Sequence, residues 1–284
     1  MNHASRSSVP VILTLGGFDP SAGAGVLADL KTFAAHNCYG VAAITALTIQ
    51  NTQGVTSVRP LPPASVKESL ASLLADVNLT AIKIGMLGNR ANAEVAEEIL
   101  SSTPSLPSVL DPVRRSTSGM DLLDEEGFTF LRERLLRCAT VITPNLAEAA
   151  ELTGLAVENV EGMKKAALRL VEMGARAAVV TGGHLEKPTD VCFDGTEMRT
   201  FVGDRVKPDN THGTGCTFAA AVAANLALGR QLVDAVMLAK AYIIEAIRKA
   251  YAVGSGRLPL DHLYRMRESP RLMDYAPPVP ERVP

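Results

Sequence analysis

Residues 9–35 read VPVILTLGGFDPSAGAGVLADLKTFAA and contain one strand, one glycine turn and one helix. Val9–Leu15 is a short apolar run of the kind that forms a buried strand, and two glycines follow it. Gly25–Ala35 repeats apolar residues every three or four positions, which predicts a helix. A strand that leads through a tight turn into a helix is the building unit of α/β proteins.

The same alternation continues on the C-terminal side of this stretch. Strands are predicted at Val41–Ile49, Ala81–Ile84, Ser108–Leu110, Thr140–Ile142 and Ala177–Thr181, and helices at Ala64–Asp76, Asn92–Leu100 and Gly162–Met173. Because these strands are apolar almost throughout, both of their faces should be covered. The pattern predicts an α/β fold with a mostly parallel central sheet and helices on both faces, in three layers.

The last third of the chain predicts a hairpin followed by two helices. Val191–Phe193 and Thr200–Val202 flank Asp194-Gly195, a dipeptide typical of hairpin turns. Gly215–Leu228 and Val233–Ala250 have the length and periodicity of long helices. The first of these helices is rich in alanine, so it can pack closely on its neighbours.

Within the chain of 284 residues, residues 9–267 are predicted to form a single domain, because no linker or internal repeat interrupts that range. Residues 1–8 and the proline- and arginine-rich residues 268–284 lack periodicity and are predicted to be disordered. No apolar run is long enough to span a membrane, and the first ten residues lack the apolar core of a secretory signal. A cytoplasmic location is therefore expected.

Charge and cysteine usage narrow the class of protein. Lys and Arg total 28 against 30 Asp and Glu, a net charge of −2, so binding to nucleic acid or to a membrane surface is not expected. The four cysteines form no CxxC or CxH pair, which argues against a zinc site and against a disulfide framework.

The segment 210–216, NTHGTGC, leads directly into the alanine-rich helix. Gly213 and Gly215 let the backbone approach a ligand, and the free N–H groups in the first turn of a helix attract anions. The spacing differs from the Walker pattern and from the dinucleotide-binding fingerprint. The segment is therefore either an anion cradle or an ordinary glycine turn, and its local sequence supports both interpretations.

Cys216 stands in the first turn of that helix. The helix dipole stabilises a thiolate at this place and lowers its pKa, so Cys216 is a candidate base or a member of an anion site. The alternative is a buried cysteine that serves as a small apolar side chain, which is the interpretation for Cys38, Cys138 and Cys192.

Two carboxylates are expected at the edge of the sheet where ligands bind. Asp111 follows the strand Ser108–Leu110, and Glu148 closes the segment TPNLAE after Thr140–Ile142. The carboxyl ends of parallel strands line the ligand crevice in such folds, and a carboxylate pair there can hold Mg²⁺. Alternatively, Asp111 is a turn residue before a proline, and Glu148 is a favourable charge in the first turn of a helix.

Taken together, these segments resemble the hydroxymethylpyrimidine/phosphomethylpyrimidine kinases of thiamin biosynthesis, which have the ribokinase-like fold. The matching stretches run from Thr14 to about Ala250 in the order of the family and span about four-fifths of the chain. They are GGFDPSAGAGVLADLKTF, YGVAAITALTIQNTQGV, IKIGMLG, LDPV, ITPNLAEAAELTG, GGH and NTHGTGCTFAAA. Each piece is short, but the joint pattern is specific to the family.

The resemblance implies roles for individual positions. The anion hole beside the transferred phosphoryl group corresponds to Gly213, Thr214, Gly215 and Cys216, with Cys216 accepting the hydroxyl proton. The pyrimidine pocket corresponds to Gly17, Asp29, Gln50, Met86 and Val113. The nucleotide site corresponds to Asn145, Glu148, Thr181, Gly182, Gly183, Gly213 and Gly215, and the Mg²⁺ site to Asp111 and Glu148. The side-chain amide of Gln50 offers a donor and an acceptor together, which suits an aminopyrimidine.

Two places depart from the pattern of the family. Arg114 and Arg115 follow DPV where the family has apolar residues. Thr181 precedes GGH where the family usually has a lysine near the nucleotide phosphates. Either one of the arginines supplies the missing cation, or both face solvent. Without this lysine, either the full rate or the second phosphorylation is in question.

The resemblance thus implies a kinase that depends on ATP and Mg²⁺, forms a homodimer, and phosphorylates 4-amino-5-hydroxymethyl-2-methylpyrimidine and then its monophosphate. Pyridoxal kinase, from the same superfamily, is the nearest alternative, although Gln50-Asn51-Thr52 favours the pyrimidine. An alternative of another class is a non-catalytic pyrimidine-binding or regulatory protein. The two departures support that alternative, whereas the glycine cradle and the two carboxylates oppose it.

Overall fold

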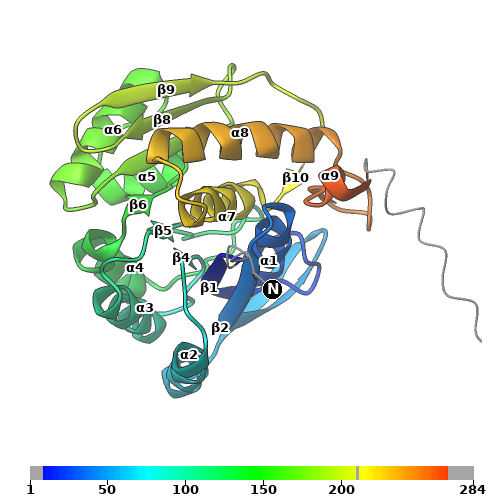
Figure 1. Ribbon diagram of the computed structural model, residues 1–284. Coiled ribbons are helices and arrows are strands. Elements are labelled where there is room, and N and C mark those ends of the chain that lie inside the picture. Colours follow the sequence, from blue (N-terminus) through cyan, green and yellow to red (C-terminus); the bar gives the residue numbers. More distant parts are fainter. Residues whose placement is uncertain (1–8, 209–210, 268–284) are drawn as a thin grey trace, which may run out of the picture.

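A nine-stranded sheet runs through the computed structural model, which describes residues 9–208 and 211–267. Its strands are β1 (Val11–Phe18), β2 (Tyr39–Asn51), β3 (Gly54–Pro60), β4 (Ala81–Ile84), β5 (Ser108–Leu110), β6 (Val141–Ile142), β7 (Ala178–Gly182), β8 (Thr189–Phe193) and β9 (Met198–Val202). They lie in the order β3-β2-β1-β4-β5-β6-β7-β8-β9 (Figure 1). The strands from β2 to β7 in this order run parallel. At one edge β3 pairs antiparallel with β2, and at the other β8 pairs antiparallel with β7 and β9 antiparallel with β8.

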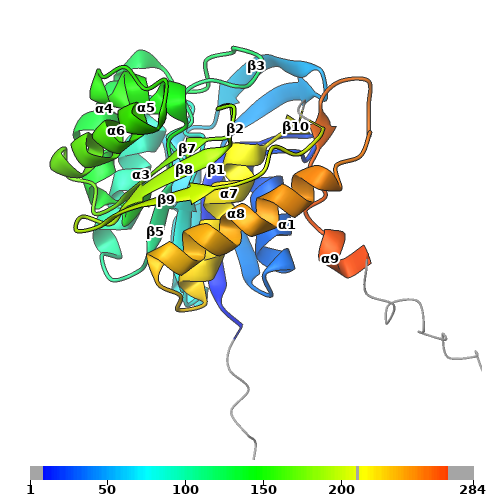
Figure 2. The same ribbon diagram turned by 90° about the horizontal axis from the view of Figure 1, so that it is seen from above.

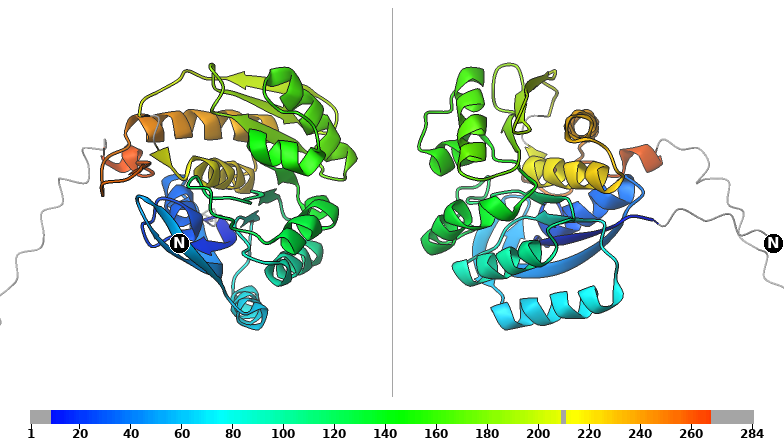
Figure 3. Two further views of the ribbon diagram at one scale, coloured as in Figure 1. Left: turned by 180° about the vertical axis from the view of Figure 1, so that it is seen from behind. Right: turned by 60° about the vertical axis from the view of Figure 1, so that its left-hand side comes forward.

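Helices cover both faces of this sheet and divide the core in two. They are α1 (Gly25–Ala35), α2 (Pro63–Asp76), α3 (Arg90–Ser102), α4 (Glu125–Glu133), α5 (Leu146–Thr153), α6 (Val160–Glu172), α7 (Thr214–Ala227), α8 (Leu232–Arg248) and α9 (Tyr264–Arg267), with a 3₁₀ turn at Leu135–Cys138. One apolar cluster joins the sheet to α2–α6, and a second joins it to α1, α7 and α8. Figure 3 shows the two helical layers from two further directions. The predicted three-layer arrangement is confirmed.

The alanine-rich α7 lies against the middle of the sheet, between α1 and α8. Ala219, Ala220 and Ala223 have no exposed surface. Small side chains let the helix approach the sheet closely, and this brings the start of α7 to the strand ends.

The region from Tyr39 to Pro60 differs from the prediction. The expected buried strand Val41–Ile49 is a longer strand, β2, and it pairs with β3, which the periodicity did not indicate. Leu47 and Ile49 are exposed, because the end of β2 leaves the covered part of the sheet. In Figure 2 the β2–β3 ribbon lies beside the chain that follows α8, and Arg257 N donates to Thr52 O there at 2.7 Å.

Two helices, α4 and α5, were also absent from the predicted set. Asp124 caps α4 by accepting from Gly127 N, and acidic residues fill its first turn. Asn145 and Glu148 form a capping box at the start of α5. Such caps stabilise short helices whose apolar periodicity is weak.

The terminal segments predicted to be disordered, residues 1–8 and 268–284, lie outside the described residues. Within the described ranges, no helix is long and apolar enough to cross a membrane.

Candidate active site

The residues singled out in the sequence gather at the carboxyl ends of the parallel strands. Asp111 follows β5, and Asn145, after β6, forms a bridge with Thr181 near the end of β7. The loop after β1 meets the segment before α7, because Gly213 lies against Gly23. One edge of the sheet therefore holds the cradle, the carboxylates and the glycine-rich loop, as expected for such folds.

The cradle has the backbone that its glycines predict. Gly213 is the N-cap of α7 in the left-handed region, with φ 84°, and a Cβ there would lie 1.9 Å from the carbonyl oxygen of Gly23. A Cβ on Gly215 would meet nothing within 4 Å, so the first turn has open space beside it. Thr214, Gly215 and Cys216 follow in that turn, where unpaired N–H groups attract an anion.

Lys83, which the sequence analysis did not single out, lies beneath the cradle with no exposed surface. Its Nζ is 3.0 Å from Asp29 Oδ2 and 3.8 Å from Asp111 Oδ2. The hydroxyl of Thr14 also donates to Asp29 Oδ2, at 2.6 Å. A lysine inside the apolar strand β4 was the available signal, since a buried ammonium needs buried anions.

Asp29 was predicted to line the pyrimidine pocket, and the structure shows it in a buried ion pair with Lys83. Its side chain has no exposed surface, and its contacts are with Thr14 and Lys83. Burial disfavours the charge on Lys83, but Asp29, Cys216 and Asp111 together outweigh that effect and raise the pKa of the ammonium. These groups therefore keep Lys83 charged within the protein.

The prediction that the helix start lowers the pKa of Cys216 is wrong. Burial raises the pKa of this thiol to about 12, although Lys83 favours the thiolate. Asp111 and Asp29 add to the rise, because they place negative charge near the sulfur. The thiol is therefore protonated at neutral pH in this state of the protein.

Asp111 and Glu148, which were predicted to hold Mg²⁺, lie close enough for their charges to interact. Asp111 is nearly fully buried, and its Oδ2 has no hydrogen-bond partner. Burial and the charge of Asp111 raise the pKa of Glu148 to about 8, whereas the Asn145 N–H lowers it. No cluster of three or more His, Cys, Asp or Glu side chains occurs in the described ranges, so phosphate and water would have to complete a Mg²⁺ site.

The predicted pyrimidine-pocket residues other than Asp29 lie together beside β1. A Cβ on Gly17 would lie 2.5 Å from Met86 Sδ, so the glycine leaves room for that side chain. Met86 and Val113 belong to a small apolar cluster at this end of the sheet. Gln50 stands on the adjoining strand β2.

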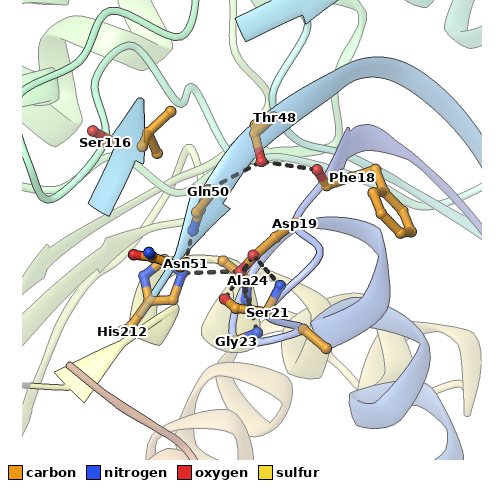
Figure 4. Close-up of polar contacts among 12 residues, drawn as sticks. Phe18, Asp19, Ser21, Gly23, Ala24, Thr48, Gln50, Asn51, Ser116 and His212 are labelled. Atoms are coloured by element: carbon orange, nitrogen blue, oxygen red, sulfur yellow. Dashed lines mark hydrogen bonds and ion pairs between the residues drawn. The ribbon is translucent and has the colours of Figure 1, made fainter. Parts of the chain in front are cut away.

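Two polar side chains next to Gln50, Asp19 and His212, were missed by the sequence analysis. His212 Nε2 lies 2.9 Å from the Gln50 amide and 3.0 Å from Asp19 Oδ2 (Figure 4). Asp19 and His212 lie inside the segments quoted above, GGFDP and NTHGTGC. Only the fold brings them together, because they are far apart in the chain.

The predicted nucleotide residues form a group of their own beyond the carboxylates. Thr181 N donates to Pro144 O at 2.9 Å, beside the capping box of α5. Gly182 N donates to Asp190 Oδ1 at 3.1 Å, and Gly183 is exposed with open space around it. Thr181, Gly182, Gly183 and Asn145 are thus next to one another, and Gly183 and Asn145 are exposed to a ligand.

Neither interpretation of the arginine pair fits the structure for Arg114. This guanidinium lies over the ring of Phe128 at 4.1 Å and pairs with Glu125 and Glu151 at 2.6 and 2.8 Å. Arg115 is half-exposed and pairs with Glu151 and with Asp121. Both guanidinium groups are thus paired with carboxylates, and these contacts give no support to the idea that either one replaces the lysine of the family at position 181.

The model of the phosphomethylpyrimidine kinase family matches residues 19–261. A hydroxymethylpyrimidine/phosphomethylpyrimidine kinase of Aquifex aeolicus is 41% identical over 248 residues, which cover 87% of this chain and 97% of that protein.

Solved structures agree with these matches. A pyridoxal kinase from Staphylococcus aureus, in complex with AMP-PCP and pyridoxal, has a TM-score of 0.83 and 36% identity over 92% of this chain and 96% of that one. A phosphomethylpyrimidine kinase from Clostridium difficile has a TM-score of 0.72 and 35% identity over 84% of this chain and 100% of that one.

Proposed function

Because this chain belongs to the phosphomethylpyrimidine kinase family, we propose that it phosphorylates 4-amino-5-hydroxymethyl-2-methylpyrimidine, and then its monophosphate, for thiamin biosynthesis. Its fold is the ribokinase-like α/β/α fold. ATP is the phosphoryl donor. The observation that carries the proposal is the meeting of the glycine cradle with Asp111 and with Gln50 at one edge of the sheet.

Phosphoryl transfer depends mainly on positioning and on neutralising charge. The first-turn N–H groups of α7 would face the transferred phosphoryl group, with Gly213, Thr214, Gly215 and Cys216 around it. The open space beside Gly215 leaves room for that group. Cys216 is proposed as a hydrogen-bonding member of the cradle, since its raised pKa opposes a role as thiolate base.

Asp111 and Glu148 would hold Mg²⁺, which supplies positive charge to the phosphate oxygens. The Oδ2 of Asp111 accepts no hydrogen bond and shares the Lys83 ammonium, 3.8 Å away, with Asp29, so a further cation would satisfy it. Asn145, Thr181, Gly182 and Gly183 would contact the nucleotide beyond these carboxylates.

The pyrimidine would lie against Gly17, Met86 and Val113, with its polar edge on the amide of Gln50. The two sides suit the ring, since apolar contacts accept its faces and the amide offers a donor with an acceptor. Replacing Gln50 by Ala removes paired hydrogen bonds and should weaken pyrimidine binding by on the order of 1–3 kcal/mol.

Pyridoxal is the second candidate substrate, because the Staphylococcus aureus structure with bound pyridoxal is similar to this chain at 36% identity. The Arg114 and Arg115 contacts and the absence of lysine at Thr181 leave a third possibility, a pyrimidine-binding protein without turnover.

A coupled ADP-release assay separates these functions. The purified protein is supplied with ATP, Mg²⁺ and either the pyrimidine, its monophosphate, pyridoxal or no acceptor. We expect ADP release with both pyrimidines well above the rate with pyridoxal. Release with pyridoxal alone indicates a pyridoxal kinase, and calorimetric pyrimidine binding without any release indicates the non-catalytic protein. Omitting Mg²⁺ tests the cation assignment.

The proposal includes a homodimer in the cytoplasm, where ATP is available. Light scattering of the purified chain, whose monomer is 30.0 kDa, measures the oligomeric state directly. A monomer that retains full activity would contradict this part alone.

A further inference from the structure

Three side chains from distant segments meet beside the cradle. Asp19 follows β1, Gln50 lies near the end of β2, and His212 immediately precedes Gly213. Figure 4 shows them pointing toward one another. A single atom, His212 Nε2, lies within hydrogen-bond distance of both neighbours, at 3.0 Å from Asp19 Oδ2 and 2.9 Å from Gln50 Nε2.

Asp19 can only accept hydrogen bonds here. Its two oxygens take four donors from its own loop, which are Ser21 N at 2.8 Å, Ser21 Oγ at 2.7 Å, Gly23 N at 3.2 Å and Ala24 N at 2.9 Å. Burial alone would raise the pKa of Asp19, but the hydrogen bonds from His212 and Ser21 outweigh it and lower that pKa. The side chain is an ionised carboxylate.

An ionised Asp19 determines which ring nitrogen of His212 carries a hydrogen. Two acceptors cannot face each other at 3.0 Å, so His212 Nε2 must bear a proton that points at the carboxylate. A protonated ring nitrogen has no lone pair left to accept a hydrogen bond. The amide group of Gln50 facing that nitrogen must therefore be the carbonyl oxygen, not the NH₂.

The contact of Thr48 with the other end of the amide independently indicates the same orientation of Gln50. Thr48 has one hydroxyl hydrogen, and its Oγ1 lies 3.0 Å from Phe18 O, which can only accept. Thr48 Oγ1 therefore accepts from the second neighbour, the Gln50 amide atom 3.1 Å away. All partners are satisfied when the Gln50 Oε1 and Nε2 positions are exchanged by a half-turn of the terminal torsion.

We propose that the Asp19–His212 pair is a specificity device, which holds the Gln50 amide with its oxygen toward the cradle and its NH₂ toward Thr48. The pair does not touch the substrate; it acts through Gln50. This inference rests on the proposed function and deepens it, because it says which ring edge the kinase accepts.

The fixed amide matches the order of groups on the aminopyrimidine. Around that ring a nitrogen acceptor comes first, then the amino donor, then the hydroxymethyl arm. The Gln50 NH₂ meets the ring nitrogen, the oxygen meets the amino group, and the hydroxymethyl arm points onward to Gly213–Cys216. The reversed amide would pair with the same edge only when the arm points away from the cradle.

Pyridoxal has the opposite chemistry next to its hydroxymethyl arm. One neighbouring position carries an aldehyde, whose oxygen accepts, and the other carries only C–H. An aldehyde oxygen would face the fixed oxygen of Gln50, so two acceptors would meet. The fixed amide therefore favours the pyrimidine over pyridoxal.

The packing leaves little freedom for His212 to turn away. A Cβ on Gly23 would lie 2.6 Å from His212 Cδ2, so the ring is in contact with the backbone of the glycine-rich loop. Asp19 is held by four donors from that same loop. The pair is thus organised before a substrate binds, which is how a site obtains selectivity from a few hydrogen bonds.

The test compares two variants at His212. His212→Leu removes the N–H, whereas His212→Gln keeps an NH₂ group where Nε2 was. Calorimetry gives the dissociation constants of the aminopyrimidine and of pyridoxal, and kcat/KM is measured for both. We expect the preference for the pyrimidine to fall about tenfold or more in the leucine variant and to stay within about threefold in the glutamine variant.

Two further variants protect this test against simple destabilisation. Asp19→Asn can place an NH₂ against His212 Nε2, so that this nitrogen no longer needs a proton and no longer holds the Gln50 oxygen toward it. This variant should therefore also reduce the preference for the pyrimidine over pyridoxal. His36→Leu is the matched control, because this buried histidine contacts Thr32 O at 2.8 Å, away from the cradle. It should lower the melting temperature without changing the preference.

The outcomes separate the inference from the function on which it rests. A wild-type protein that phosphorylates neither ring contradicts the proposed function, and the binding ratio then still tests the pair. A wild-type protein that prefers the pyrimidine, with the same preference in His212→Leu and Asp19→Asn, overturns the inference alone.

Discussion

Lys83 is a buried cation shared by more than one acidic group. Asp29 lies 3.0 Å from its Nζ and Asp111 lies at 3.8 Å, while Cys216 is close enough to feel its charge. A second carboxylate on one ammonium leaves negative charge without a partner. Burial and the charge of Asp29 therefore raise the pKa of Asp111, although Lys83 lowers it.

Replacing Lys83 by Met should lower the free energy of unfolding by about 3–5 kcal/mol, because Asp29 is then buried without a counter-ion. Urea unfolding followed by circular dichroism measures the loss. The double variant Lys83→Met with Asp29→Asn should recover part of it. A loss under about 1 kcal/mol in the single variant would mean that water or Thr14 satisfies the carboxylate.

Cys216 should behave as a protonated thiol. Its pKa of about 12 implies a thiolate fraction at neutral pH far below that of an ordinary cysteine, so iodoacetamide should modify it at least about 100-fold more slowly than glutathione. Peptide mapping by mass spectrometry measures the rate, with Cys138, which is partly exposed like Cys216, as internal control.

The same assignment makes a kinetic prediction for Cys216→Ala. Losing a hydrogen-bonding thiol should reduce kcat about tenfold, whereas losing a general base costs roughly 10²–10⁴-fold. Rapid alkylation together with the larger loss of kcat would instead support the assignment of Cys216 as a thiolate base.

The loop that follows β5 is held to two helices by Arg114. This side chain is only 13% exposed, lies over Phe128 of α4, and pairs with Glu151 of α5. The backbone of Arg114 also hydrogen-bonds Glu148, a predicted cation ligand. The arginine thus ties the loop after Asp111 to the helices that surround the carboxylates.

Arg114→Ala should loosen this loop and destabilise the fold by about 1–2 kcal/mol, because a partly buried ion pair and a stacking contact are lost. Hydrogen exchange of residues 113–122 should speed up by at least about tenfold. Arg115→Ala is the matched control: water screens its half-exposed ion pairs, so their loss should change the stability little.

The KM for ATP should stay within about twofold in both arginine variants, since both guanidinium groups are already paired. A severalfold rise in either variant would support a phosphate contact instead.

Across the molecule, the end of the described chain returns to the layer that carries the cradle. β11 (Leu258–Pro259) pairs with β10 (Thr211–His212), the strand that carries His212. His262 is nearly fully buried, its Nε2 lies 3.0 Å from Thr217 Oγ1 on α7, and its carbonyl accepts from Tyr242 on α8 at 2.7 Å. This segment therefore joins α7 and α8.

Acid should weaken the fold through His262. Burial, and then the charge of Lys31, lower the pKa of this histidine to about 4, from an ordinary value of 6.5. Between pH 6.5 and 4 the unfolded chain binds a proton that the folded chain does not, so stability falls as the pH falls, by up to about 3 kcal/mol. Above pH 6.5 the effect is absent.

Urea unfolding at pH 7.5, 5.5 and 4.5 measures this dependence. His262→Gln keeps a polar group beside Thr217 and does not titrate, so its stability should fall less than that of the wild type over this range. Parallel curves for the two proteins would show that other groups cause the acid sensitivity.

The sequence by itself determined the alternation of the central strands with most of their helices, and the edge of the sheet where the site lies. Apolar strands between amphipathic helices can bury both faces only as a covered parallel sheet, so Asp111, Asn145 and the cradle had to meet at one edge. Glycine spacing also determined the cradle, because a residue with φ 84° against the Gly23 carbonyl must lack a Cβ. The β2–β3 ribbon and the capped helices α4 and α5 were missed, since their formation depends on pairing and caps more than on periodicity.

Only the tertiary structure decided the electrostatics of the site. Local sequence placed Cys216 at a helix start, but burial beside two carboxylates outweighs the dipole and keeps it protonated. Arg114 looked free in the sequence and is neutralised by Glu125 and Glu151. The same holds for the Gln50 amide, whose orientation depends on a proton of His212 that points at Asp19, a residue 193 positions away in the chain. Charges and protons respond to neighbours in space, and spacing along the chain does not reveal those neighbours.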